Sequence, residues 1–236
     1  MDQTPNEPQA EPLWLRMAEN LAVRYSEQPL ARAIIATAAF FFPPLLPIDA
    51  AAGAWGGAIG ADRLRATMAE VEVAMARVHG RLDSQLDPEE LVDYAIQALR
   101  GATETRDIEK RRVLAAALVG AATTDRPADL DFAAVMAGLS SLTPADLQYA
   151  RELADAVANN PYKIIDYVGP PATAGDGTFH LLRLQSQGLV HSVAPGAVIG
   201  IGPGLQYRLT PTFWSVLELL RAGGMEVPKP ADAAPN

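Results

Sequence analysis

The chain has 236 residues, a formal net charge of −9 at pH 7 and no cysteine. Hydrophobic residues make up 49% of it, which is enough to bury a core and excludes a wholly disordered chain. The lack of cysteine excludes a disulfide scaffold and a thiolate metal site, and it fits a reducing cytoplasm. A protein with this negative net charge also repels nucleic acid unless one of its faces is basic.

The N-terminal part is predicted to contain a disordered arm and one helix. Residues 1–12 are polar and rich in proline, as is typical of a mobile arm. Residues 13–26 carry apolar side chains three and four positions apart, which places them on one face of a helix. These side chains are Trp14, Met17, Leu21 and Tyr25.

Residues 30–61 form an apolar stretch rich in proline and glycine, in which Asp49 is the single charge between Ala33 and Ala61. Prolines interrupt the stretch, so that neither half reaches the roughly 20 apolar residues that span a membrane. One interpretation is a buried helical hairpin. The alternative is a hairpin that inserts into a membrane. Its candidate membrane contacts are Ile35, Phe40, Phe41, Phe42 and Trp55.

The middle of the chain, up to residue 160, is predicted to be a helical bundle. Asp87 and Pro88 are typical of a helix start, and Gly101 is interpreted as the stop of that helix. Another helix, over residues 107–122, begins inside the most densely charged run of the chain. We interpret this run as a solvated helix start whose charges pair with one another, Asp107 with Lys110 or Arg111 and Glu109 with Arg112. Further helices are predicted over residues 129–139 and from Thr143 to about residue 160. With the preceding segments, the bundle gives a helical body over residues 13–160.

The sequence from residue 161 to 224 predicts a small α/β module. A helix over residues 178–187 is followed by two strand-like runs, GLVHSV and LQYRLT, with a glycine-rich loop between them. Thr210 and Pro211 then open a final helix, which Gly223 and Gly224 end. This order of elements is compatible with a winged helix-turn-helix. The remaining residues, 225–236, are predicted to be a disordered tail.

The predicted module has few side chains that suit nucleic acid. A recognition helix presents cationic and amide side chains to phosphates and base edges. The candidate contact residues here are His180, Arg183, Gln187 and Arg208. This small set favours a face that binds protein. DNA binding and a purely structural role are the alternatives.

The sequence contains no complete catalytic or cofactor-binding motif. It lacks the G-x-S-x-G elbow of a nucleophilic serine and the lysine that closes a P-loop. His79, His180 and His191 are not spaced as two metal ligands on one helix face. We therefore predict a protein that is not an enzyme, with no catalytic residue, no metal and no cofactor.

The chain resembles a group of bacterial proteins related to the abortive-infection alpha type. The resemblance is carried by three segments: DPEELVDYAIQALRGATETRDIEKRRVLAAALVGA, LSSLTPADLQYARELAD and LLRLQSQGLV…YRLTPTFWSVLELL. It covers about residues 30–221 and implies a bacterial protein of the phage-defence or stress-response kind. It assigns no functional residues.

Together these patterns predict a mainly α-helical protein, with a helical bundle followed by a small winged-helix-like α/β module. The leading functional hypothesis is a non-enzymatic interaction protein of the cytoplasm that binds another protein or a second copy. One alternative is a DNA-binding transcriptional regulator. The other is an effector that inserts residues 33–61 into a membrane.

Overall fold

The computed structural model describes residue 33 and residues 53–86, 88–159, 165–166, 175–193 and 206–229. Within this part the chain is mainly helical and has a small antiparallel sheet, as the sequence predicts. The helices are α3 (Gly53–Val78), η1 (His79–Arg81), α4 (Pro88–Glu104), α5 (Ile108–Ala121), α6 (Phe132–Ser141), α7 (Pro144–Val157), α8 (Gly175–Ser186) and α9 (Pro211–Ala222). The strands are β1 (Ile165–Asp166), β2 (Val190–Ser192) and β3 (Gln206–Leu209).

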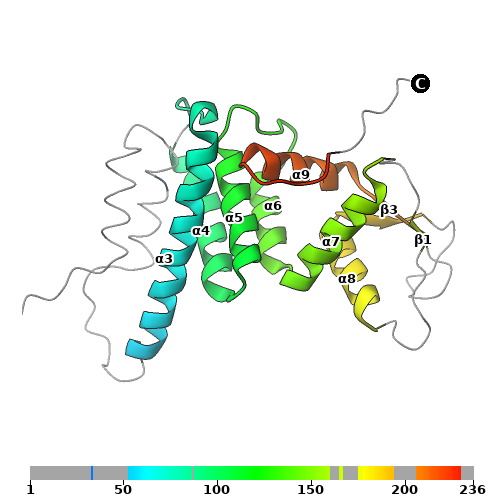
Figure 1. The fold of residues 1–236 in the computed structure, drawn as a ribbon, viewed down its shortest axis with the longest axis horizontal. Helices are drawn as coiled ribbons and strands as arrows, with labels where there is room; N and C mark the ends of the chain where they lie inside the picture. The colour runs from blue at the N-terminus through cyan, green and yellow to red at the C-terminus, as the bar shows by residue number, and fades with distance from the viewer. Residues whose placement is uncertain are drawn as a thin grey trace, which may run out of the picture.

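Helix α5 is the centre of the bundle, with α3, α4, α6 and α9 packed around it (Figure 1). Every residue of α5 from Val113 to Ala121 is buried. A helix that is apolar on all sides has no solvent face, so it takes the central position. Most of its buried side chains are alanine and valine, which lets several neighbours approach closely.

Helix α9 crosses α5 where the two backbones nearly touch. A Cβ atom on Gly120 of α5 would collide with the backbone oxygen of Leu219, and one on Gly223 would collide with the backbone oxygen of Ala116. The sequence identifies Gly223 as the end of the last helix. The structure shows that both glycines are also required by the contact between α5 and α9.

Helices α3, α4 and α8 differ from the prediction, and α8 runs from Gly175 to Ser186 where residues 178–187 are predicted. Helix α3 begins at Gly53, inside the stretch interpreted as a hairpin, and α4 continues through Gly101 to Glu104. Gly101 is therefore not a helix stop. A Cβ atom there would lie 2.6 Å from the Ser140 hydroxyl oxygen, so this glycine lets α4 and α6 pack closely.

Polar side chains cap the starts of α5, α6, α7 and α9. Asp107, Asp131 and Thr210 each accept a hydrogen bond from a backbone N–H in the first turn of α5, α6 and α9. Thr143 and Asp146 form a reciprocal capping box at the start of α7.

The sheet has the strand order β1-β3-β2, with both pairs antiparallel. In the β2–β3 pair, Val190 lies opposite Leu209 and His191 lies opposite Arg208. Val190, Tyr207 and Leu209 are buried, so one face of the sheet packs on the core. The two strand-like runs of the sequence are therefore confirmed.

The predicted disordered tail begins inside the packed structure. Met225 and Val227 are half-buried against the core, and the Met225 N–H donates to the Leu220 carbonyl at 3.0 Å. Arg221 donates to the Pro228 carbonyl at 2.8 Å. We refer to residues 225–228 as the C-terminal strap. The predicted arm, the first predicted helix and most of the apolar stretch lie outside the described residues.

Candidate functional site

A buried carboxylate joins α7 to α8. Asp146 is fully buried and is contacted by the His180 ring at 2.5 Å and by the Arg183 guanidinium at 2.8 Å. It also accepts hydrogen bonds from the backbone N–H and the hydroxyl of Thr143, both at 2.7 Å. We call these four residues the Asp146 cluster.

The Asp146 cluster keeps its carboxylate ionised. Burial by itself raises the pKa of Asp146, but hydrogen bonds from His180, Thr143 and Arg183 outweigh it and lower the pKa to about 2. Asp146 is therefore an anion at neutral pH and neutralises the charge of the guanidinium beside it.

The cluster accounts for two of the predicted contact residues. His180 is half-buried and also packs on Tyr149, with ring centroids 5.5 Å apart. The Arg183 side chain is 44% exposed, but its Nε atom faces Asp146. Both side chains hold α8 against α7. The sequence places Asp146 only in a helix start and does not show that α8 supplies its partners.

The other two predicted contact residues lie on separate elements. Gln187 is exposed just after α8 and faces Gly138 of α6. Arg208 is on β3, opposite His191, and its buried Nε atom has no hydrogen-bond partner among the residues that the structure describes. Neither residue takes part in the Asp146 cluster.

The candidate membrane contacts Ile35, Phe40, Phe41 and Phe42 lie outside the described residues. Trp55 is in α3, of which only the backbone is described at that position. In the part of the chain that the structure describes, no helix is long and apolar enough to cross a membrane.

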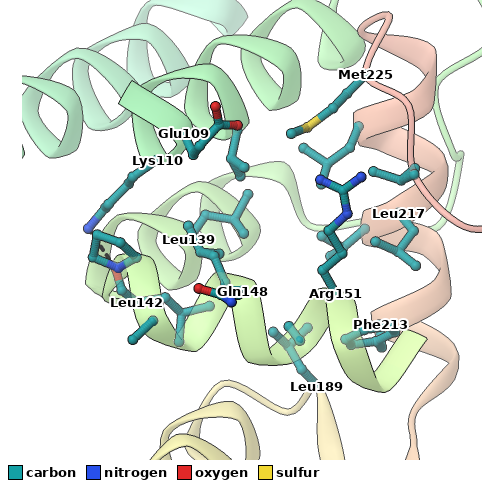
Figure 2. A pocket seen from close by; sticks show the side chains of 18 of the residues that line it. Glu109, Lys110, Leu139, Leu142, Gln148, Arg151, Leu189, Phe213, Leu217 and Met225 are labelled. Carbon is teal, nitrogen blue, oxygen red and sulfur yellow. Dashed lines mark hydrogen bonds between the residues drawn. The ribbon is translucent and has the colours of Figure 1, made fainter. Parts of the chain in front are cut away.

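A cavity of about 400 Å³ lies between α5, α7, α9 and the C-terminal strap (Figure 2). We call it the apolar pocket. Its walls are mostly aliphatic and aromatic side chains, among them Val113, Leu139, Leu142, Leu147, Phe213 and Leu217. No sequence signal identifies it, because its walls come from separate parts of the chain, including α5, α6, α7 and α9, and because the C-terminal strap is predicted to be disordered.

Lys110 stands at one wall of the apolar pocket and is 8% exposed. Its ammonium group donates to the carbonyls of Ser140 and Leu142 at 2.7 and 2.6 Å. Burial lowers the pKa of Lys110, against the opposite effect of Glu104, Asp146 and Asp107. The charged helix start is therefore only partly solvated. Glu109 and Arg112 pair at 2.6 Å as predicted, whereas Lys110 fastens α5 to the turn between α6 and α7.

A second hollow, which we call the charged groove, adjoins the apolar pocket. It has a volume of about 590 Å³ and is lined by residues of α3, α5, α7 and the segment after α9. Glu109, Arg151 and Met225 line both spaces. The apolar pocket therefore opens onto a polar surface at these three residues.

Comparisons with known proteins add no assignment to these sites: the chain matches no protein-family model, no curated protein and no solved structure. Within the described ranges, no three side chains of histidine, aspartate or glutamate gather as a metal site would require.

Proposed function

We propose that this chain is a non-enzymatic interaction protein whose residues 161–224 form a winged-helix-like module that binds protein. The sheet order β1-β3-β2 supports the module, because a winged helix places its first strand beside the third. Helix α8 precedes the β2–β3 pair, where a winged helix has its recognition helix. The resemblance to the abortive-infection alpha type adds a setting in bacterial phage defence or stress response.

The observation that carries this proposal is that the cationic side chain of α8 is paired within the fold, while an aromatic ring of the same helix is exposed. Arg183 and His180 of α8 both contact Asp146. The carboxylate therefore neutralises the guanidinium charge of Arg183 that would otherwise attract a phosphate. Phe179, by contrast, is 58% exposed. Besides Arg183, the exposed side chains toward the end of α8 are the neutral Gln185, Ser186 and Gln187.

An exposed aromatic ring beside neutral polar groups suits a protein partner. Aromatic residues are enriched in protein interfaces and charged residues are depleted from their centres. A DNA-reading helix has the reverse composition, since most of its contacts go to phosphates. The module therefore favours a protein, a second copy of this chain included, over a duplex.

The proposal is tested by photo-crosslinking from position 179. Benzoylphenylalanine replaces Phe179 in one sample and Val73 in the control; Val73 is a 46% exposed residue of α3. We expect a crosslinked protein species from position 179 alone, either a dimer of this chain or a heteromer of defined mass. Equal crosslinking from both positions, or none from either, contradicts the proposal.

The DNA-binding alternative keeps one supporting observation, the partly exposed guanidinium of Arg183. It predicts that a duplex binds at low salt, that binding weakens steeply as salt rises, and that Arg183→Glu abolishes it. Gel shift with a pool of random duplexes measures all three. Because Asp146 already neutralises Arg183, we expect no shift.

A further inference from the structure

We infer that the apolar pocket binds an amphipathic monocarboxylate, with the apolar body inside the pocket and the carboxylate on Arg151. This inference does not depend on the proposed protein-binding face, because the pocket does not involve Phe179 or the sheet.

The apolar pocket has the size and lining of a ligand site. Its volume of about 400 Å³ lies within the roughly 300–1,000 Å³ that small-molecule pockets occupy. The wall residues Val113, Leu142 and Phe213 are buried, so these walls belong to the core, whereas Glu109 and Arg151 at the opening are exposed. An unfilled apolar space forfeits packing contacts, and an apolar ligand restores them.

Arg151 supplies the cation that such a ligand needs. It lies on α7, and no hydrogen bond or ion pair engages it within the part of the chain that the structure describes. Figure 2 shows its guanidinium reaching from α7 toward the side of the pocket where Met225 lies. A guanidinium forms two parallel hydrogen bonds with a carboxylate, so an acid group is its natural counterpart.

The other charged groups at the pocket already have partners. Asp107 caps α5, Lys110 donates to two backbone carbonyls, and Glu109 pairs with Arg112. Arg112 is also held by Glu70 of α3 at 3.3 Å. A ligand carboxylate therefore finds Arg151 available and the acidic neighbour Glu109 already neutralised.

The opening of the apolar pocket explains why the ligand is expected to be amphipathic. Arg151 lies where the apolar pocket meets the charged groove, since it lines both. A ligand whose apolar body fills the pocket thus places its polar end at Arg151 and in the groove. The groove also contains Glu226, which disfavours a second acid group. Its other cations are engaged, since Arg77 donates to the Gly224 carbonyl and Arg112 pairs with Glu70 and Glu109. A single carboxylate is therefore favoured.

Calorimetric titration of the full chain with decanoate and with 1-decanol tests the inference. The two probes share their alkyl chain and differ in the carboxylate. We expect one decanoate to bind per chain, and Arg151→Gln to weaken decanoate binding about tenfold while leaving 1-decanol unaffected. The matched control is Arg100→Gln, which removes an exposed arginine of α4 that pairs with Glu104.

A second variant tests the location. Ala150→Phe fills the pocket from α7 and keeps Arg151, so it is expected to abolish binding of both probes. Circular dichroism and thermal unfolding establish that each variant is folded. If Ala150→Phe does not fold, Arg151→Gln still tests the inference, because it changes an exposed side chain.

Three outcomes overturn the inference. The first is that neither probe binds the wild-type chain. The second is that decanoate binds equally well to Arg151→Gln and to the wild type. The third is that a folded Ala150→Phe binds decanoate as the wild type does.

Discussion

At the scale of single residues, Asp146 links two helices through one buried carboxylate. It is fully buried, it completes the capping box of α7, and it receives His180 and Arg183 from α8. A buried charge is tolerated only when its hydrogen-bonding capacity is met, and here four donors meet it. The carboxylate thus couples the start of one helix to the packing of another.

Asp146→Asn is expected to lower the free energy of unfolding by about 2 kcal/mol, because it removes the charge that its donors require. The value is below that of a wholly buried pair because water reaches Arg183. Urea unfolding measures it. Asp155→Asn, at an exposed position of the same helix, is the control and is expected to change little. Equal effects of the two substitutions contradict this assignment.

The low pKa of Asp146 also predicts how stability depends on pH. The carboxylate titrates at about 2 in the folded chain and near its ordinary value of 3.8 when unfolded. Its contribution is therefore fully present above about pH 4 and is lost as the pH falls toward 2, on the order of 2 kcal/mol in all. The groups that face it are His180, Arg183, Thr143 and the more distant Lys110.

Urea unfolding at pH 5, 4 and 3 compares the wild type with Asp146→Asn. The wild type is expected to lose more stability over this interval than the variant does. Parallel losses in both proteins mean that other carboxylates cause the acid sensitivity.

At the scale of elements, the contact between α5 and α9 depends on having no side chain at Gly120 and Gly223. Gly120→Ala is expected to destabilise the fold by about 3 kcal/mol, since the new methyl group meets the backbone of α9 and cannot be accommodated by a side-chain rotation. Thermal or urea unfolding gives the value.

Gly80→Ala is the matched control for this substitution, because a Cβ atom at Gly80 meets nothing within 4 Å. It is expected to change stability by no more than about 0.5 kcal/mol. If Gly120→Ala is tolerated as well as Gly80→Ala is, then α5 and α9 do not pack as closely as described.

At the scale of the whole molecule, the C-terminal strap closes one side of the apolar pocket. Truncation before Met225 is expected to lower the free energy of unfolding by about 2 kcal/mol, because it exposes the surface that Met225 and Val227 cover. It is also expected to weaken decanoate binding. Truncation after Lys229 is the control and leaves the strap in place. A strap that can be removed without effect on either measurement is not part of the core.

The membrane alternative is also a question for the whole molecule. If residues 33–61 insert into a membrane, the untagged protein stays in a carbonate-washed membrane pellet, and Ile35→Asp releases it in folded form. Ultracentrifugation followed by circular dichroism of the released protein tests this. If Ile35→Asp unfolds the protein, then Ile35 belongs to a core.

Structural features that depend on residues close together along the chain are predictable from the sequence. The starts of α5, α7 and α9 follow from Asp107, Thr143 and Thr210, because a capping side chain bonds to an N–H only a few residues away. The pairing of Glu109 with Arg112 follows from the helical repeat in the same way. The mainly helical character is likewise the sum of local apolar spacings.

The tertiary structure decided what each residue meets from a distant part of the chain. Gly101 has the local signature of a helix stop, and only the approach of α6 shows why α4 continues through it. His180 and Arg183 suit a recognition helix by their residue types, but both contact Asp146 of α7, which lies more than thirty residues earlier in the chain. The apolar pocket and Arg151 at its opening follow from the packing of α5, α7 and α9, because a cavity belongs to the space between elements and leaves no periodic signal in any one of them.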